Sequence, residues 1–212
     1  KISVFESDLF EPIITNIRGL ANKEDVRAER IVADHIRSAT FAVADGAVPS
    51  NTGAGYIVRR LVRRAVRYGK IMGINDSFVS QIAKEVIATM GDVYPELKQQ
   101  EVIIISELDK EEEKFGQTLG TGLKELERIV EHIGSTQEHG TNVSKHGANI
   151  SGEQAFLLFQ SYGFPFEMTK ELAQEKGLKI ATRMIRNFSQ DDIIYKDNNY
   201  INVYLLFYIY FL

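Results

Sequence analysis

The sequence contains no cysteine, which excludes disulfide bonds, thiol catalysis and metal sites built on cysteine. The same absence favours an intracellular, cytoplasmic location. Long hydrophobic runs are also missing. The longest uncharged run, residues 200–212, has 13 residues and is too short to span a bilayer. The chain starts at Lys1 without an initiator methionine or a signal peptide, so we expect a fragment of a longer protein.

Groups typical of a complete active site are missing as well. We find no nucleophile paired with a base, and no pair of carboxylates in a recognisable frame. His132, His139 and His146 are spaced by seven residues, but no carboxylate stands at ligand spacing, so we expect no metal site. We interpret His35, next to Asp34 on a predicted helix, as a structural hydrogen-bonding group.

Positive charge is concentrated in one segment of an otherwise mildly acidic chain. The net charge of −4 is no general signature of a nucleic-acid-binding protein. Within residues 51–70, however, one side of a predicted amphipathic helix collects six cations and no anion: Arg59, Arg60, Arg63, Arg64, Arg67 and Lys70. Like charges four residues apart repel each other. This cationic side therefore predicts contact with a phosphate backbone, and we expect it to face solvent.

Another interpretation of this cationic side stays open. The arginines could pair with acidic residues elsewhere in the fold, and residues 107–113 could supply them. In functional terms, the alternative to RNA binding is a non-catalytic helical interaction module. Such a module would dock its basic helix face on an acidic protein surface.

A loop rich in glycine and proline precedes the basic helix. It lacks the Lys-Ser/Thr ending of a P-loop and follows no predicted strand, which argues against nucleotide binding at Gly53 and Gly55. We expect these glycines to let two backbone segments approach closely, with Asn51 at the loop tip. An asparagine amide both donates and accepts, which suits a base edge, although an ordinary Asx-turn is the alternative.

Hydrophobic spacing predicts a mainly α fold: a helical bundle with one long helix or helical hairpin, and few or no strands. The expected helices lie within residues 4–17 (starting at Ser7 or Asp8), 22–46, 56–69, 75–91, 95–133, 151–163 and 169–177, with loops at 46–55 and 134–149. Residues 22–25 and 75–77 are expected to cap the helices that they begin, and Ser151 and Gln154 form a capping-box pattern. Three glycines, Gly116, Gly120 and Gly122, predict a break or a close helix contact in the longest expected helix.

Several segments together resemble alanyl-tRNA synthetase. They are R-I-V-A-D-H-I-R at residues 30–37, A-D-G-A-V-P-S-N at 44–51, G-Y-I-V-R-R-L-V-R-R-A-V-R at 55–67, S-G-E-Q-A-F at 151–156 and S-Y-G-F-P at 161–165. The resemblance runs in order from about residue 4 to residue 180. It implies that residues 1–180 are the helical tRNA-recognition domain, between a class II adenylation domain and an editing domain. Residues 181–212 form a divergent tail without an assigned role.

This resemblance implies an enzyme as the parent protein, an alanine–tRNA ligase, of which this segment lacks the ATP and alanine sites. ATP with Mg would bind the missing adenylation domain, and this segment would need no cofactor. Its partners would be the acceptor stem of tRNA(Ala) and the adenylation and editing domains, with no membrane. The module would recognise a G·U wobble pair in that stem.

The resemblance also assigns residues. Two family positions read the wobble pair: an Asn that matches Asn51, and an Asp whose place is taken by Gln160. The family often carries Arg where Ala54 stands here, so recognition would depend more on Asn51 and the arginine helix. The expected tRNA-binding residues are therefore Asn51, Arg59, Arg60, Arg63, Arg64, Arg67, Lys70 and Gln160. The cations would supply affinity and the two amides would discriminate.

Overall fold

The computed structural model describes residues 3–138 and 149–180, and they form a mainly α fold, as predicted. The elements are η1 (Val4–Glu6), α1 (Glu11–Leu20), α2 (Val26–Ala44), α3 (Gly53–Ile71), α4 (Val79–Met90), α5 (Pro95–Gln99), α6 (Glu101–Glu138), β1 (Asn149–Ile150), α7 (Gly152–Tyr162), α8 (Phe166–Glu175) and β2 (Lys179–Ile180). The two short strands pair in parallel, Asn149 with Lys179 and Ile150 with Ile180.

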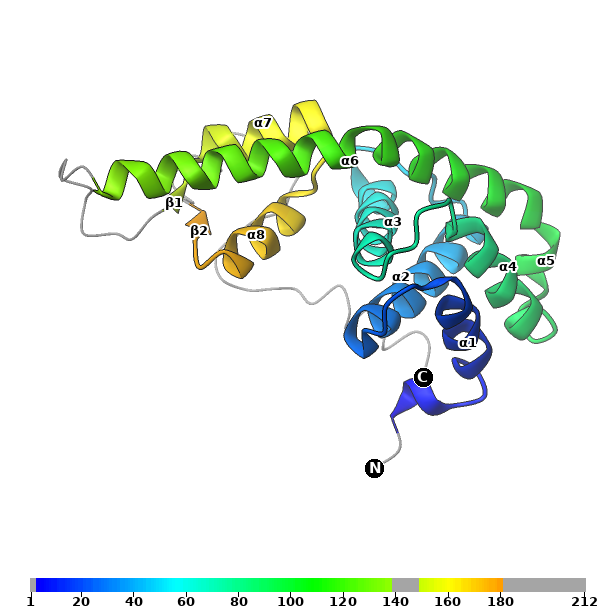
Figure 1. The fold of residues 1–212 in the computed structure, drawn as a ribbon. Coiled ribbons are helices and arrows are strands. Elements are labelled where there is room, and N and C mark those ends of the chain that lie inside the picture. Colours follow the sequence, from blue (N-terminus) through cyan, green and yellow to red (C-terminus); the bar gives the residue numbers. More distant parts are fainter. Residues whose placement is uncertain (1–2, 139–148, 181–212) are drawn as a thin grey trace.

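Helices α2 and α3 pack along each other at the centre of a helical body, which α1, α4, α5 and the first half of α6 complete (Figure 1). Their apolar faces meet in one core, in which Ile36, Val62, Ile82 and Leu108 have no exposed surface. The predicted apolar side of the basic helix, including Val58 and Ala65, lies in this core as well. Helix α3 is thus fixed along its length, and its opposite side is held in a defined place.

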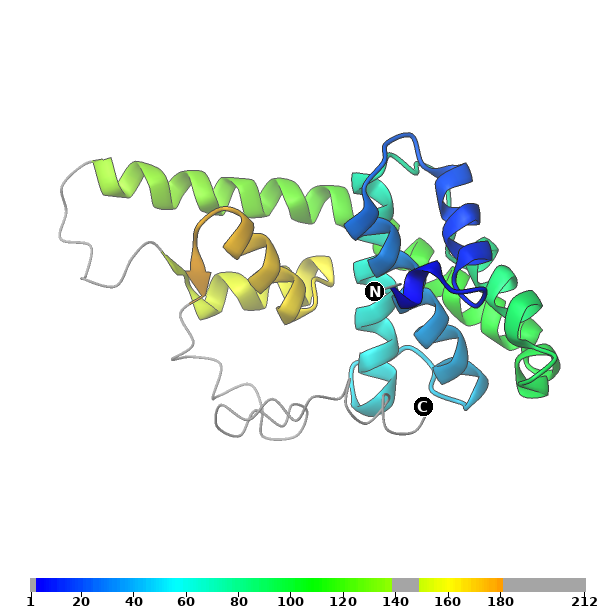
Figure 2. The same cartoon turned by 90° about the horizontal axis from the view of Figure 1, so that it is seen from below.

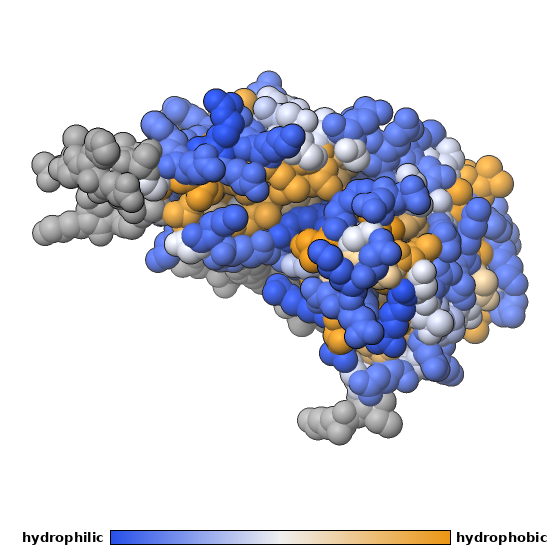
Figure 3. Space-filling model, viewed as in Figure 1, coloured by the Kyte–Doolittle hydropathy of each residue, from blue (hydrophilic) through white to orange (hydrophobic). Residues whose placement is uncertain are grey.

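The second half of α6 projects from this body and carries α7 and α8 along its side (Figures 1 and 2). Leu126, Leu158 and Phe164 bury their side chains there, and Figure 3 shows an apolar band between α6 and α8. Helix α6 does not break at its glycines. A Cβ at Gly122 would lie 2.6 Å from the Phe164 ring, which confirms the predicted close contact. A Cβ at Gly116, in contrast, would have no neighbouring atom within 4 Å.

Two helix starts and one helix end follow from local sequence, as predicted. Asp25 accepts the backbone N–H of Ala28 at 2.9 Å and caps α2. Ser151 and Gln154 form the predicted capping box at α7, with hydrogen bonds of 3.1 and 2.8 Å. Gly163 ends α7 in the left-handed region, at φ 70°.

Other helix boundaries differ from the prediction because distant residues or prolines set them. Helix α1 starts at Glu11 and not at Ser7 or Asp8, and Pro165 moves the start of α8 from Thr169 to Phe166. Helix α3 begins at Gly53, inside the predicted loop 46–55, whose glycines had indicated a loop up to Gly55. Helix α4 starts at Val79, where Glu112 of α6 accepts the N–H groups that residues 75–77 were expected to cap. Helix α6 continues to Glu138, into the predicted loop 134–149; the rest of that loop before residue 149, His139 and His146 included, and the tail 181–212 lie outside the described residues.

Candidate nucleic-acid interface

The predicted solvent-facing row of cations on α3 is wrong in one respect: its central members are buried. Arg63 is 3% exposed and Arg67 is 5% exposed. The reason is that α6 and α8 bring glutamates to this side of α3, so that ion pairs replace water around the guanidinium groups. The second interpretation of the sequence, arginines paired with acids of the same chain, describes this part of the structure.

Glu111 is the acid from the predicted segment 107–113. Its Oε1 lies 2.5 Å from Nε of Arg63 and 3.5 Å from Nε of Arg59. The Arg63 guanidinium also lies 5.1 Å from the centre of the Phe115 ring. Burial lowers the pKa of Arg63, and the charge of Glu111 opposes that shift. We call Arg59, Glu111 and Arg63 the inner cluster.

Helix α8 supplies a second set of acids, Glu167, Glu171 and Glu175, which we call the glutamate row. Four-residue spacing places them on one side of α8. Their partners on α3 are Arg60 for Glu167 (2.8 Å), Arg64 for Glu171 (2.9 Å) and Arg67 for Glu175 (2.6 Å). The sequence analysis missed this row, although its regular spacing within residues 167–175 was visible as a signal.

His35 continues this network into the core, as the structural hydrogen-bonding group that the sequence predicted. Its Nε2 lies 2.8 Å from Nη1 of Arg64, and its Nδ1 lies 3.1 Å from Oδ2 of Asp34. Because a guanidinium only donates, Nε2 accepts and Nδ1 carries the hydrogen. Burial lowers the pKa of His35, against the influence of Asp34. The neutral ring thus holds Arg64 in place.

The loop before α3 holds two backbone segments together, as predicted from its glycines. A Cβ at Gly55 would lie 2.2 Å from the carbonyl oxygen of Val48, and the Ser50 N–H donates to the Gly55 carbonyl at 3.1 Å. Gly53 has φ 55°, which favours glycine. Asn51 is exposed at the tip, and its Oδ1 accepts a hydrogen bond from Nη1 of Arg59.

Gln160 is exposed on the last turn of α7. It stands three residues before Gly163, to which the inner cluster is also bonded. Arg63 donates from Nη1 to the carbonyl oxygen of Gly163. The segments that carry Asn51 and Gln160 are therefore both tied to the inner cluster, one through Arg59 and the other through Arg63. The two segments thus meet α3 within residues 59–63, in the first half and middle of the helix.

Comparison with known proteins now places the chain. The family model described as tRNA synthetases class II (A) matches residues 1–196. This chain belongs to the class II (A) tRNA synthetase family. It is 44% identical over 184 residues to the alanine–tRNA ligase of Pelotomaculum thermopropionicum, a match that covers 84% of this chain and 20% of that relative.

Further alanine–tRNA ligases give similar values. Identity is 42% over 182 residues with the ligase of Pediococcus pentosaceus and 42% over 185 residues with that of Carboxydothermus hydrogenoformans. These matches cover 83% and 84% of this chain and 20% of each relative. The chain thus spans about a fifth of the length of the curated relatives it matches. The motif resemblance to alanyl-tRNA synthetase is confirmed at this level.

The last predicted cation of this class II synthetase chain is separate from the others. Lys70 is exposed and donates to the carbonyl oxygen of Asn75 at 2.6 Å. It stands 19 residues after Asn51, and the helix between them, α3, is roughly 28 Å long. Lys70 therefore belongs to the C-terminal end of the cationic side, at the opposite end of α3 from Asn51.

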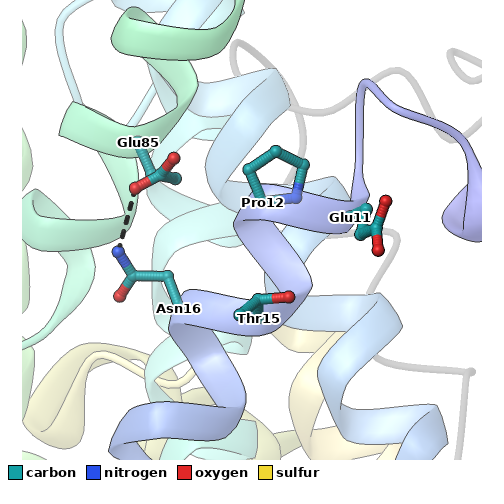
Figure 4. A pocket seen from close by; sticks show the side chains of 5 residues that line it. All are labelled: Glu11, Pro12, Thr15, Asn16 and Glu85. Atoms are coloured by element: carbon teal, nitrogen blue, oxygen red, sulfur yellow. Dashed lines mark hydrogen bonds between the residues drawn. The ribbon is translucent and has the colours of Figure 1, made fainter.

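An open cavity of about 480 Å³ between α1 and α4 is lined by Glu11, Pro12, Thr15, Asn16 and Glu85 (Figure 4). Asn16 donates from Nδ2 to Glu85 at 3.2 Å, and Gln81 donates to Asn16 at 3.1 Å. The lining side chains thus partly satisfy one another. Within residues 3–138 and 149–180 no cluster of His, Asp or Glu could hold a metal ion, and no helix is long and apolar enough to cross a membrane.

Proposed function

We propose that this chain is the part of an alanine–tRNA ligase that recognises the acceptor stem of tRNA(Ala) in the cytoplasm. Alanine activation with ATP and Mg then belongs to an adenylation domain outside residues 1–180, and editing to a further domain. The observation that carries the proposal is the placement of Asn51. Asn51 is exposed at the tip of a loop, and the close packing at Gly55 fixes the backbone of that loop. A side chain that reads a base edge needs both properties, access to the RNA and a fixed position.

Burial of the central arginines changes how such a module would meet RNA. Asn51 and Gln160 would enter the shallow minor groove of the A-form stem and discriminate. The side chains of Arg60 and Arg64 are 24% and 27% exposed, and with Lys70 they would meet phosphates from beside the glutamate row. Arg63 and Arg67 would contribute to RNA binding without touching RNA, because their bonds hold α6, α7 and α8 against α3.

This arrangement makes a measurable difference to the salt dependence of binding. Three phosphate contacts correspond to a slope of about −2 to −3 in a plot of log K against log salt. Six contacts, one for each cation of the predicted row, would give a slope about twice as steep. The same ion pairs bear on the protein-docking alternative, because a basic face that is paired with acids of its own chain offers fewer cations to an acidic protein as well as to RNA.

A chimeric ligase tests the proposal. The matching 184-residue segment of the Pelotomaculum thermopropionicum ligase is replaced by its counterpart from this chain. The chimera should charge tRNA(Ala) and should catalyse alanine-dependent exchange between ATP and pyrophosphate. A chimera that activates alanine normally but charges no tRNA would contradict the proposed equivalence of the two segments.

Asn51→Ala in the chimera separates recognition from activation. It should lower kcat/KM for charging by about tenfold, the effect of roughly one hydrogen bond, and leave the exchange rate unchanged. Gln160→Ala should act in the same direction. Asn75→Ala, an exposed asparagine beyond the other end of α3, is the matched control and should charge like the parent chimera. Equal charging by all three variants would overturn the assignment of the site.

A further inference from the structure

We infer that Arg59 is a positioning residue for Asn51: it holds the side-chain oxygen of Asn51, so that the Asn51 NH₂ group faces the RNA as a hydrogen-bond donor. The inference rests on the proposed function. It replaces the role that the sequence suggested for Arg59, a direct contact with phosphate, by an indirect role in specificity.

The chemistry of the contact between the two side chains fixes how the Asn51 amide is turned. Nη1 of Arg59 donates to Oδ1 of Asn51. A guanidinium carries five N–H donors and no acceptor, so only the amide oxygen can face it. The orientation of the Asn51 amide is therefore dictated by its neighbour. With the oxygen held by Arg59, the NH₂ group is the side of the Asn51 amide turned away from Arg59, and it carries two donors for a ligand.

Arg59 is itself held in place by the inner cluster. Its side chain is only 12% exposed, and its Nε lies 3.5 Å from Oε1 of Glu111. The same oxygen binds Nε of Arg63 at 2.5 Å, and Glu111 and Arg63 are both buried. A guanidinium fixed in this way has few conformations to lose when it orients an exposed amide. It is also poorly placed to lie on a phosphate at the surface.

The chemical consequence concerns the kind of atom that Asn51 can read. A donor at the tip of the loop matches an acceptor in the minor groove: N3 of a purine, O2 of a pyrimidine or a ribose 2′-hydroxyl. A carboxylate at position 51 could still accept from Arg59 but could not donate. Asn51→Asp is therefore a nearly isosteric variant that removes the donor and leaves the contact with Arg59.

Two roles of Arg59 predict different results for Arg59→Met in the chimeric ligase. A positioning role predicts a loss of about tenfold in binding an acceptor minihelix with the G·U pair, no loss for the same minihelix with G·C, and an unchanged salt slope. A phosphate contact predicts a similar loss for both RNAs and a slope that is shallower by about 1. Arg128→Met, an exposed arginine of α6, is the control and should leave both RNAs unaffected.

A double-mutant cycle completes the experiment. Asn51→Ala, Arg59→Met and the double variant should show the same loss for the G·U minihelix, because Arg59 acts through Asn51. Fully additive losses, or an unaffected Arg59→Met, would overturn the inference while the proposed function stands. An unaffected Asn51→Ala would overturn the proposed function itself.

Asn51→Asp does not depend on the stability of the inner cluster, since residue 51 is exposed. It should bind the G·U minihelix as weakly as Asn51→Ala does. Retained discrimination in Asn51→Asp would show that position 51 accepts rather than donates, and would contradict the inference even if Arg59→Met failed to fold.

Discussion

Arg64 of α3 and Glu171 of α8 form a two-point ion pair between residues 107 positions apart in the chain. Nε of Arg64 donates to Oε2 of Glu171 at 3.1 Å, and Nη2 donates to Oε1 at 2.9 Å. The hydroxyl of Tyr68 donates to the same Oε1 at 2.6 Å. Because the Glu171 side chain is 17% exposed, this pair is shielded from water and connects α8 to the central helix.

Acid should therefore weaken the protein through Glu171. Burial raises the pKa of Glu171, but hydrogen bonds from Arg64 and Tyr68 and the nearby cations outweigh it and lower the pKa to about 2. The unfolded chain then binds a proton more readily than the folded one. The contribution of Glu171 to stability is complete at neutral pH and is lost as the pH falls from about 5 to 2.

Glu171→Gln tests this contribution in the 212-residue chain. At pH 7 it should lower the free energy of unfolding by about 1–2 kcal/mol, because Arg64 loses its partner. At pH 3 the difference from the wild type should shrink. Urea titrations at both pH values measure it, with Glu175→Gln, whose side chain is 44% exposed, as the milder control. A deficit of the same size at both pH values would refute the lowered pKa of Glu171.

His35 predicts a second loss of stability, nearer to neutrality. Burial lowers the pKa of His35, so the unfolded chain takes up a proton at about pH 6.5 while the folded ring stays neutral. This sign means that stability falls as the pH drops below about 6.5. Protonation would place a hydrogen on Nε2 of His35, which could then no longer accept the hydrogen bond from Nη1 of Arg64.

His35→Gln should be less stable than the wild type at pH 7 by about 1–2 kcal/mol and should depend less on pH between 7 and 5.5. The measurement is the urea midpoint at the two pH values. If His35→Gln kept the wild-type dependence on pH, another group would have to titrate in this range.

Local sequence predicted those features that neighbouring residues decide. The capping box of Ser151 and Gln154, the cap at Asp25 and the close approach at Gly55 each involve residues a few positions apart. The start of α4 could not be found in this way, because Glu112 caps it from 33 and 34 residues away. The α-helical class of the fold followed from hydrophobic periodicity alone.

The cationic side of α3 shows where such reasoning ends. Its pattern predicts a polyanion, and both a phosphate backbone and a row of glutamates satisfy that description. The glutamates stand on α8, more than 100 residues later, and only the folding of α6 and α7 brings them to α3. Asn51 and Gln160 were assigned through family motifs rather than by physical reasoning, and their role in binding tRNA remains a prediction.

Two helix glycines should respond to alanine in opposite directions. A Cβ at Gly69 would lie 2.4 Å from the ring of Phe78, which is 1% exposed and cannot move away. Gly69→Ala should cost about 1–3 kcal/mol. On α6, the Cβ added by Gly116→Ala would have no neighbouring atom within 4 Å. This variant should therefore gain up to about 1 kcal/mol in the free energy of unfolding, because alanine favours the helix more than glycine does. Urea unfolding of the two variants gives both values, and similar effects would contradict the packing of α3 on Phe78.

Glu112 should be a stabilising residue whose effect is confined to the start of α4. Its two carboxylate oxygens accept the N–H groups of Phe78 and Val79, each at 3.0 Å, although burial raises the pKa of Glu112. Glu112→Ala leaves both buried donors without this acceptor and should cost about 1–3 kcal/mol. Glu112→Gln keeps one acceptor oxygen without the buried charge, so it should cost less.

Hydrogen exchange distinguishes this role from a general loss of packing. In Glu112→Ala the amides of Phe78 and Val79 should exchange faster than in the wild type by more than the change in global stability explains. Glu113→Ala, at the exposed neighbouring position of α6, should leave both amides and the free energy of unfolding nearly unchanged. Uniformly faster exchange throughout the core of Glu112→Ala would instead mean that the carboxylate supports the whole helical body rather than one helix start.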